Sequence, residues 1–340
     1  MVKFSKEHLR FLKKLIIMLV TINIVISCNS DNSEDIIIED YVGDVILKTQ
    51  IEVDDFGKKE YLNIIGSLWI TPEDLSDIQN LSALKSLTCI SGDLVIKFSN
   101  LIDLSGFNNL TKIEGGLYMN SNPSLASLTG LSKLETVGTV AGRDMLQIDD
   151  NNSLVNIDGL KSLTTITGIL WIANNSSIAN IRGVNNLSTI NRHLWILNNP
   201  KLTSLEGLEK IEFLGESEGH LLIDDNDSLL NLKGLENLSI IKGYIQITNN
   251  NALIDFNELA NLTLVNYGVN IQDNSSLVSL DGFINLKSAG GFTIQSNSVL
   301  ADFCGLKPFL EEDTLDTQYI VNSNLYNPTK EQIVDGNCSN

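Results

Sequence analysis

Histidine, the commonest general base, is scarce in this sequence. His8, His193 and His220 are its only histidines, and general acid–base catalysis needs a titratable group held within reach of its reaction partner. His193 and His220 occupy similar positions, just before a predicted strand in neighbouring repeats, so a metal pair is conceivable. We favour a solvated pair at the rim of the fold. We therefore expect no catalytic residue, no cofactor and no metal.

Acidic residues gather at three predicted turns, each of which follows a strand. They are Asp149-Asp150, the run from Asp224 to Asp227, and Asp273. Carboxylates and carbonyls at a turn could hold calcium. The three turns belong to repeats that are not adjacent, and none has the spacing of an EF-hand loop. We favour ordinary turn chemistry, in which Asp and Asn side chains bond to their own backbone.

All three tryptophans occupy the centre of a Leu-Trp-Ile triplet. They are Trp69, Trp171 and Trp195, and Tyr118 takes the corresponding place in another repeat. Side chains alternate along a strand, so this central position faces outward. Trp171 and Trp195 fall in successive repeats, and we expect their rings about 5 Å apart in a flat aromatic strip. Such a strip could stack on sugar rings or anchor a protein partner.

Trp69, Tyr118, Trp171 and Trp195 are therefore the candidate ligand-binding residues. Two other interpretations stay open. Large aromatic side chains suit an outer sheet face through cross-strand pairing alone, and a neighbouring subunit could cover them.

The aromatic triplets belong to a repeat, L-x-[IM]-x-x-N-x-x-L-x-x-L-x-G-L-x-x-L-x-x-I. Its asparagines are spaced 23 to 29 residues apart, and a glycine follows eight positions after each one except where Glu258 stands. The asparagines are Asn122, Asn151, Asn175, Asn199, Asn226, Asn250, Asn274 and Asn297. Two degenerate coils precede them, around Leu68-Trp69-Ile70 and Leu94-Val95-Ile96, and both lack the asparagine. We count ten coils.

The spacing predicts a mainly β fold, a parallel β-solenoid of about ten coils. Each coil begins with a short strand that pairs in parallel with its copy about 4.8 Å away. The asparagine amide can donate and accept along the stack, and the glycine permits a positive φ or a close backbone approach. A single coil buries too little apolar surface to fold alone, so stability comes from contacts between coils.

Both ends of the stack are expected to be capped, because exposed strand edges invite aggregation. Before the first coil, Asp44 to Lys48 reads as a strand, and Thr49 with Glu52 forms a capping box that opens a short helix. After the last coil, the segment from Cys304 to Cys338 breaks the repeat and is expected to form an irregular cap.

The motif L-x-I-x-x-N-x-x-L-x-x-L-x-G-L, with coils near 24 residues, resembles the receptor L-domain family over about residues 60 to 310. These domains are leucine-rich-repeat-like, right-handed parallel β-helices of receptor ectodomains, fungal wall proteins and bacterial surface lipoproteins, so the resemblance implies a right-handed solenoid. The resemblance implies binding of ligands or partners through outer faces, and it brings no catalytic residues. The chain lacks the cysteine-rich modules and the kinase segment of the receptors, which argues against a hormone-receptor role.

The N-terminus has the features of a secretory signal. Basic residues precede an apolar run from Leu15 to Ile26, which at about a dozen residues is too short to span a bilayer. Val25-Ile26-Ser27-Cys28 resembles the lipobox of bacterial lipoproteins, which implies cleavage before Cys28 and diacylglycerol on its thiol. An ordinary signal peptide with a chance cysteine is the alternative. The acidic stretch 29–35 resembles the export signals of some surface-exposed lipoproteins, or is a plain linker.

Removal of residues 1–27, with five basic residues and one acidic residue, lowers the formal charge from −19 to −23. This charge disfavours nucleic acid as a partner, and it means that membrane attachment would depend on the acyl chains of Cys28. Of the four cysteines, Cys28 is assigned to lipid. Cys89 and Cys304 lie too many coils apart to bond, so elimination pairs Cys304 with Cys338 and leaves Cys89 free.

These observations divide the chain into five parts. They are a lipoprotein signal peptide (1–27), an acidic tether (28–40), an N-terminal cap (41–65), the receptor L-domain-like solenoid (66–306) and a C-terminal cap (307–340). We expect an outer-membrane, surface-exposed binding or adhesion module, with a glycan or protein ligand. The alternatives are a secreted carbohydrate-active enzyme with a β-helix fold, such as a lyase, and a structural spacer. The outward strand column carries no charged residue, which argues against a lyase.

Overall fold

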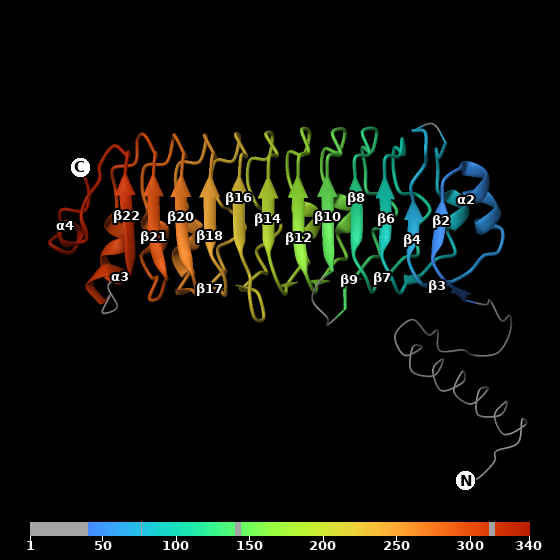
Figure 1. The fold of residues 1–340 in the computed structure, drawn as a ribbon, viewed down its shortest axis with the longest axis horizontal. Coiled ribbons are helices and arrows are strands. Elements are labelled where there is room, and N and C mark those ends of the chain that lie inside the picture. Colours follow the sequence, from blue (N-terminus) through green and yellow to red (C-terminus); the bar gives the residue numbers. More distant parts are fainter. Residues whose placement is uncertain (1–39, 76, 140–143, 313–316) are drawn as a thin grey trace, which may run out of the picture.

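The computed structural model describes residues 40–75, 77–139, 144–312 and 317–340, which form one long stack of coils (Figure 1). The signal peptide, Cys28 and all but the last residue of the acidic tether lie outside the described residues. Each coil contributes one strand to a parallel sheet that runs the length of the stack, so the predicted solenoid is confirmed.

The main sheet has twelve strands in simple sequential order, all parallel. Ten of them open the ten predicted coils, and one further strand lies at each end. The strands are β2 (Val45–Leu47), β4 (Leu68–Ile70), β6 (Leu94–Lys97), β8 (Leu117–Asn120), β10 (Met145–Asp149), β12 (Ile169–Ala173), β14 (Leu194–Leu197), β16 (Leu221–Asp224), β18 (Ile245–Thr248), β20 (Gly268–Gln272), β21 (Gly291–Gln295) and β22 (Gln318–Asn322).

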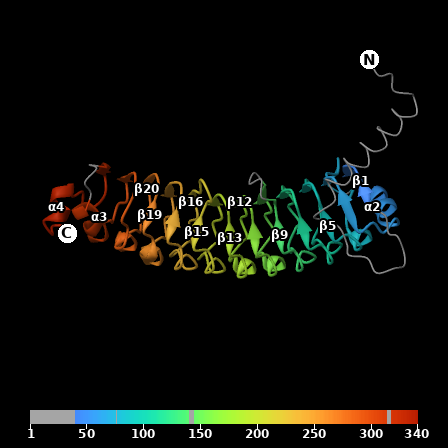
Figure 2. The ribbon, with the colours of Figure 1, turned by 90° about the horizontal axis from the view of Figure 1, so that it is seen from below.

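A second line of very short parallel strands runs along another side of the coils (Figure 2). It is divided into sheets of seven and three strands. The first comprises β1 (Tyr41–Val42), β3 (Asn63–Ile65), β5 (Cys89–Ile90), β7 (Lys112–Ile113), β9 (Thr136–Val137), β11 (Thr165–Ile166) and β13 (Thr189–Ile190), and the second comprises β15 (Phe213–Leu214), β17 (Ile240–Ile241) and β19 (Leu264–Val265). The return path of several coils contains one turn of 3₁₀-helix, as at Arg182–Val184.

The interior is a continuous aliphatic core. In strand β12, Leu170 and Ile172 are fully buried, whereas Trp171 between them is partly exposed. The leucines of the return path, such as Leu187, are equally buried. The alternation predicted from the sequence is thus confirmed in this strand. At the corresponding position of β6, Val95 is buried.

The asparagines form a buried ladder of hydrogen bonds along the stack. The side chain of Asn226 donates from Nδ2 to the carbonyl oxygens of Ile196 (2.9 Å) and Asp224 (3.0 Å), and its Oδ1 accepts from the backbone N–H of Asn199 (3.1 Å). Each amide therefore satisfies backbone groups that would otherwise be buried without partners. Ser99 starts the ladder and Asn324 continues it past the last predicted coil.

A residue with positive φ precedes every member of this ladder. The ten residues have φ between 51° and 60°, and they are Phe98, Ser121, Asp150, Asn174, Asn198, Asp225, Asn249, Asp273, Ser296 and Ser323. The left-handed region is several-fold enriched in Asn and Asp, which explains Asp150, Asp225 and Asp273 as parts of the bend.

The glycines eight positions beyond the asparagines are explained by crowding. A Cβ at Gly183 would lie 2.0 Å from the carbonyl oxygen of Ile157 in the preceding coil, and one at Gly130 would lie 1.9 Å from that of Leu104. Gly130 also has a positive φ of 114°, but the close approach is the feature that the two glycines share.

The N-terminal cap has the predicted form. Strand β2 extends the main sheet, and helix α2 (Gln50–Gly57) begins at the capping box of Thr49 and Glu52. The helix covers the first coil, where Gln50 N–H donates to the carbonyl oxygen of Asp77 (2.7 Å).

The C-terminal cap is more regular than predicted. Helix α3 (Lys307–Glu312), strand β22 and helix α4 (Lys330–Val334) follow the tenth coil, and β22 pairs in parallel with β21 over five residues. The sequence Tyr319-Ile320-Val321 followed by Asn324 is a diverged copy of L-x-I-x-x-N. The prediction of an irregular cap missed this copy because tyrosine replaces the inward leucine.

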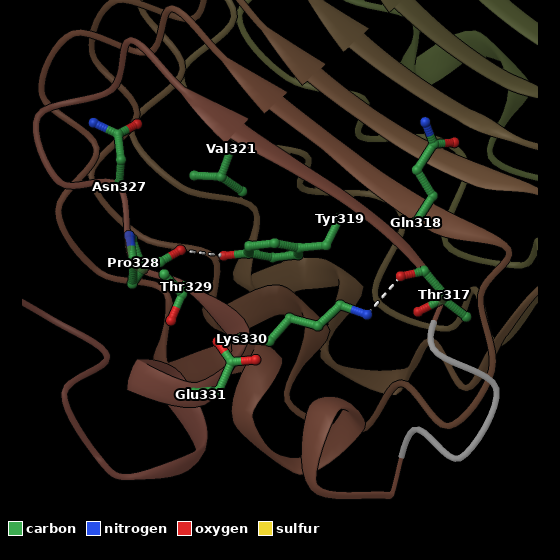
Figure 3. Close-up of a pocket in the computed structure, with 9 residues that line it drawn as sticks. All are labelled: Thr317, Gln318, Tyr319, Val321, Asn327, Pro328, Thr329, Lys330 and Glu331. Carbon is green, nitrogen blue, oxygen red and sulfur yellow. Dashed lines mark hydrogen bonds between the residues drawn. The ribbon is translucent and has the colours of Figure 1, made fainter.

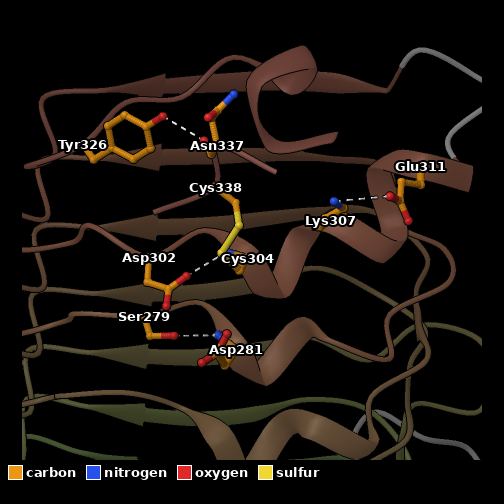
Figure 4. The surroundings of a disulfide bond; sticks show 9 residues. All are labelled: Ser279, Asp281, Asp302, Cys304, Lys307, Glu311, Tyr326, Asn337 and Cys338. Carbon is orange, nitrogen blue, oxygen red and sulfur yellow. Dashed lines mark hydrogen bonds and ion pairs between the residues drawn. A yellow bond between two sulfur atoms is a disulfide. The ribbon is translucent and has the colours of Figure 1, made fainter. Parts of the chain in front are cut away.

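The predicted disulfide between Cys304 and Cys338 is confirmed, with a Cα–Cα distance of 4.9 Å (Figure 4). It ties the C-terminal residues to the tenth coil, where the N–H of Phe303 also donates to the carbonyl oxygen of Cys338 (2.9 Å). The far edge of the stack is thereby held closed.

The prediction that Cys89 is free is wrong. Cys89 is disulfide-bonded, and none of the described cysteines is free. Its partner is neither Cys304 nor Cys338, because these bond to each other. The elimination that left Cys89 free relied on assigning Cys28 to lipid, so the two assignments have to be tested together.

Candidate binding face

The outer face of the main sheet presents the side chains that alternate with the buried ones. Two columns of side chains stand on this face. The central column comprises Trp69, Val95, Tyr118, Gln147, Trp171, Trp195, Leu222, Gln246, Asn270 and Thr293, in the register predicted from the sequence. The leading column lies two residues earlier on each strand and includes Met145, Ile169, His193, His220, Tyr244, Gly268 and Gly291.

Trp171 and Trp195 are direct neighbours in the central column. Their ring centroids lie 5.0 Å apart, as predicted, but the ring planes meet at 67°. The predicted flat strip is therefore wrong. The two rings meet edge to face, an arrangement that aromatic pairs favour at this distance. The indole Nε1 of each ring is buried and has no hydrogen-bond partner. Each unpaired donor has a desolvation cost that a bound acceptor could offset.

The other two candidate residues stand apart from this pair. Trp69 is 39 % exposed in β4, and Val95 separates it from Tyr118 in β8. Gln147 in turn separates Tyr118 from Trp171. The four residues share one face and one column, but only Trp171 and Trp195 touch.

The leading column contributes a stack of rings that the sequence analysis did not identify. His193 lies parallel to Trp195 (centroids 5.4 Å apart, planes at 2°) and to His220 (4.4 Å, 5°). His220 stacks in turn on Tyr244 (3.9 Å, 27°). Trp171, Trp195, His193, His220 and Tyr244 thus form one connected group across four coils, which we call the aromatic cluster.

The two histidines are structural parts of this stack, and the solvated rim pair expected from the sequence is wrong. His193 is 5 % exposed, and its Nδ1 accepts from the backbone N–H of His220 (3.0 Å). The Nδ1 of His220 accepts in the same way from Tyr244 N–H (3.1 Å). The parallel strands bring equivalent ring nitrogens and amides together in successive coils, which fixes the ring orientation.

Burial keeps the two histidines of the stack neutral. Desolvation, followed by the neighbouring His220 and Arg192, lowers the pKa of His193 to about 4. Desolvation also lowers the pKa of His220, although Glu218, with Oε1 3.3 Å from Nε2, acts in the opposite direction. Both rings are therefore neutral near pH 7, and the aromatic cluster is an uncharged surface on an acidic protein.

Two longer connections bracket the tryptophan pair. The connection from β9 to β10 is five residues longer than in a 24-residue coil, and the connection from β15 to β16 is three residues longer. The ladder asparagines on either side of these connections are accordingly 29 and 27 residues apart. Strands β12 and β14, which carry the two tryptophans, lie between β10 and β16 in the sheet (Figure 1). In repeat proteins, insertions concentrate on one face, which is often the binding face.

A hollow of about 310 Å³ adjoins the aromatic cluster. It begins at Tyr244 and extends over the next strands, where glycine replaces the ring of the leading column. Its lining consists of Tyr244, Ile245, Gln246, Gly268, Val269, Asn270, Gly290, Gly291, Phe292, Thr293 and Gln318. Every lining side chain is uncharged at neutral pH.

A second cavity, of about 520 Å³, lies at the C-terminal end between β22 and the segment before α4 (Figure 3). Its polar groups largely bond to one another. Tyr319 Oη donates to the carbonyl oxygen of Pro328 (3.1 Å), and Lys330 Nζ donates to that of Thr317 (2.6 Å). Burial raises the pKa of Tyr319. We regard this cavity as part of the cap.

One cluster of opposite charges lies on the return path of the coils. Glu206 forms ion pairs with Arg182 and with Lys233, and these hydrogen bonds lower the pKa of Glu206. A catalytic acid needs a raised pKa and a partner base, whereas this cluster holds a single carboxylate. The cluster is better explained as a link between three adjacent coils.

Residues 63–154 match the Receptor L domain family. The match spans the first coils, and the same repeat continues through Asn297 with unbroken parallel pairing. A comparison with curated proteins finds no match. Within the described residues, no helix has the length and apolarity needed to cross a membrane. The repeat identified from the sequence is therefore supported independently, and its ligand has to be inferred from the surface.

Proposed function

We propose that this protein is a cell-surface binding or adhesion module and that its ligand, a glycan or a protein, lies on the outer face of the main sheet. The single observation that carries the proposal is the aromatic cluster. Aromatic side chains are enriched at binding hot spots because they offer large apolar surfaces at little entropic cost.

The alternative is that the rings serve only to stabilise the sheet. Cross-strand pairing accounts for the contact of Trp171 with Trp195, but it leaves two buried indole N–H groups unpaired. It also gives no reason for longer connections on both sides of this pair. A ligand that covers the tryptophan pair would account for the placement of these rings between the two longer connections.

The test is an array of glycans and proteins probed with the purified chain. For any ligand found, the double variant Trp171→Ala, Trp195→Ala should weaken binding at least ten-fold. Ile46→Ala is the control, because it removes an exposed apolar side chain from the same column outside the aromatic cluster. A double variant that folds normally and binds every ligand as tightly as the parent would overturn the proposal, and an array without any ligand would favour a structural spacer.

The anchoring that we propose rests on the N-terminal sequence. A thioether from Cys28 to diacylglycerol would hold the module at the outer membrane, with the acidic tether 29–35 between lipid and solenoid. Cys28→Ala should abolish incorporation of radiolabelled fatty acid during growth. Label that persists in this variant would contradict the lipobox interpretation.

The same experiment has to account for Cys89. An acylated Cys28 has no thiol left for a disulfide, and Cys28 is the only other cysteine of the chain outside the Cys304–Cys338 bond. Peptide mapping after alkylation without reductant separates the two states. Acylation predicts an alkylated Cys89 in the labelled protein, whereas a Cys89 that resists alkylation would count against the anchor.

A further inference from the structure

The leading column changes abruptly where the aromatic cluster ends. His193, His220 and Tyr244 stack in consecutive coils, and the next two positions are Gly268 and Gly291. Tyr244 therefore has the ring of His220 on one side and the 310 Å³ hollow on the other. The hollow is lined by these two glycines, and the ring of Tyr267, next to Gly268, lies 6.5 Å from that of His220.

The walls of the hollow offer hydrogen bonds without charge. Gln246, Asn270 and Thr293 are successive members of the central column, and Gln318 closes the far side. The Oδ1 of Asn270 is buried and has no donor. An acceptor of this kind favours a ligand that brings its own hydroxyl or N–H group.

We propose that the hollow binds one neutral pyranose ring, as a residue of an oligosaccharide. This inference rests on the proposed function and specifies the ligand class. The ring takes the place of the missing side chain, with its apolar face against Tyr244 and its hydroxyl groups toward Gln246, Asn270 and Thr293. The volume is at the lower end of ligand pockets, which fits one sugar ring.

Two other ligands fit the hollow less well. An anionic sugar would find no cation among the lining residues, and it would approach a chain of formal charge −19. An aromatic side chain of a protein partner would stack on Tyr244 equally well, but a phenyl ring would leave Asn270 Oδ1 without a donor. The hydroxyl groups of a pyranose meet both requirements.

Gly268 is a suitable position for a substitution that fills the hollow. A Cβ at this position would have the Gly291 carbonyl oxygen, 3.7 Å away, as its nearest neighbour, and Gly268 does not have a positive φ. Gly268→Leu therefore fills the hollow without strain, whereas Gly268→Ala fills little of it. Asn270→Leu is a second variant, which removes the acceptor and keeps the volume. Ile46→Ala, at an exposed position of strand β2, is the control outside the site.

The probes are the methyl glycosides of glucose, galactose, mannose and N-acetylglucosamine, with glucuronate and phenylalanine amide for the two disfavoured classes. Saturation-transfer NMR measures binding to the purified full chain. At least one neutral glycoside should bind, lose its signal in Gly268→Leu and weaken at least ten-fold in Asn270→Leu, while Gly268→Ala and Ile46→Ala retain binding. Binding of no neutral glycoside, a signal that survives Gly268→Leu, or preferential binding of glucuronate or phenylalanine amide would overturn the proposal.

The failures of the two proposals are distinguishable. If an array ligand depends on Trp171 and Trp195 but binds Gly268→Leu normally, the binding face stands and the sugar subsite is refuted. If array ligands bind and none depends on the tryptophans, the aromatic cluster is refuted as the ligand site.

Discussion

At the scale of single residues, the histidines show what a sequence pattern can and cannot reveal. The sequence placed His193 and His220 at equivalent positions before neighbouring strands, and the structure confirms the position. Their burial could not be predicted, because it depends on the rings of Trp195 and Tyr244, which stack on those of His193 and His220. A search for aromatic residues one position before each triplet would have found the stack.

The buried histidines predict a stability that depends on pH. The pKa of His193 is about 4 in the folded chain and near 6.5 in the unfolded chain, so the unfolded state binds the proton first. The folded state is favoured fully above pH 6.5 and loses stability as the pH falls toward 4. The loss from this one proton is at most about 1.4 kcal/mol per pH unit.

His193→Phe removes this proton and keeps a flat ring in the stack. Thermal melts between pH 7 and pH 4 should show a smaller fall in Tm than in the parent. The variant should also be less stable at pH 7 by about 1 kcal/mol, because it loses the hydrogen bond from His220 N–H. The same pH dependence in parent and variant would show that His193 does not titrate as the structure indicates.

At the scale of the repeated element, the bend is built from two consecutive residues with different tasks. The first takes a positive φ, and the second turns its amide into the buried ladder. The sequence predicted the ladder from the asparagine spacing. It did not predict the left-handed residue, because Phe98, Ser121 and Ser296 occupy this bend position in three of the coils and obscure its preference for Asn and Asp.

Two neighbouring asparagines in the eighth coil allow a ladder residue to be compared with a surface residue. Asn250 is fully buried and donates to the carbonyl oxygens of Ile223 (2.9 Å) and Thr248 (2.8 Å). Asn251 is exposed and bonds to Asp227. Asn250→Ala should lower the free energy of unfolding by about 2–4 kcal/mol, because it leaves buried carbonyl groups unpaired. Asn251→Ala should change it by less than about 0.5 kcal/mol.

Urea titrations measure both values on the same chain. A loss that is equal in the two variants, or absent from Asn250→Ala, would show that the ladder contributes no stability of its own. A changed slope of the transition in Asn250→Ala would instead indicate that the coils on either side unfold separately.

At the scale of the whole molecule, the repeat made the fold predictable and the site only partly so. Ten coils, the register of the outward column and the N-terminal cap follow from spacing, alternation and the capping box, and the Cys304–Cys338 disulfide was predicted by elimination among the cysteines. The strand β22, the bond of Cys89 and the hollow beside Tyr244 do not, since each depends on how diverged or distant segments meet in space.

The central claim is that ligands bind at the aromatic cluster, and tryptophan emission reports on it directly. The chain has three tryptophans, and Trp69→Phe leaves Trp171 and Trp195 as the only emitters. Titration of this variant with a ligand from the array should shift or quench the emission, with a midpoint equal to the Kd from calorimetry. Saturable heat of binding without any change in emission would place the ligand elsewhere and contradict the account.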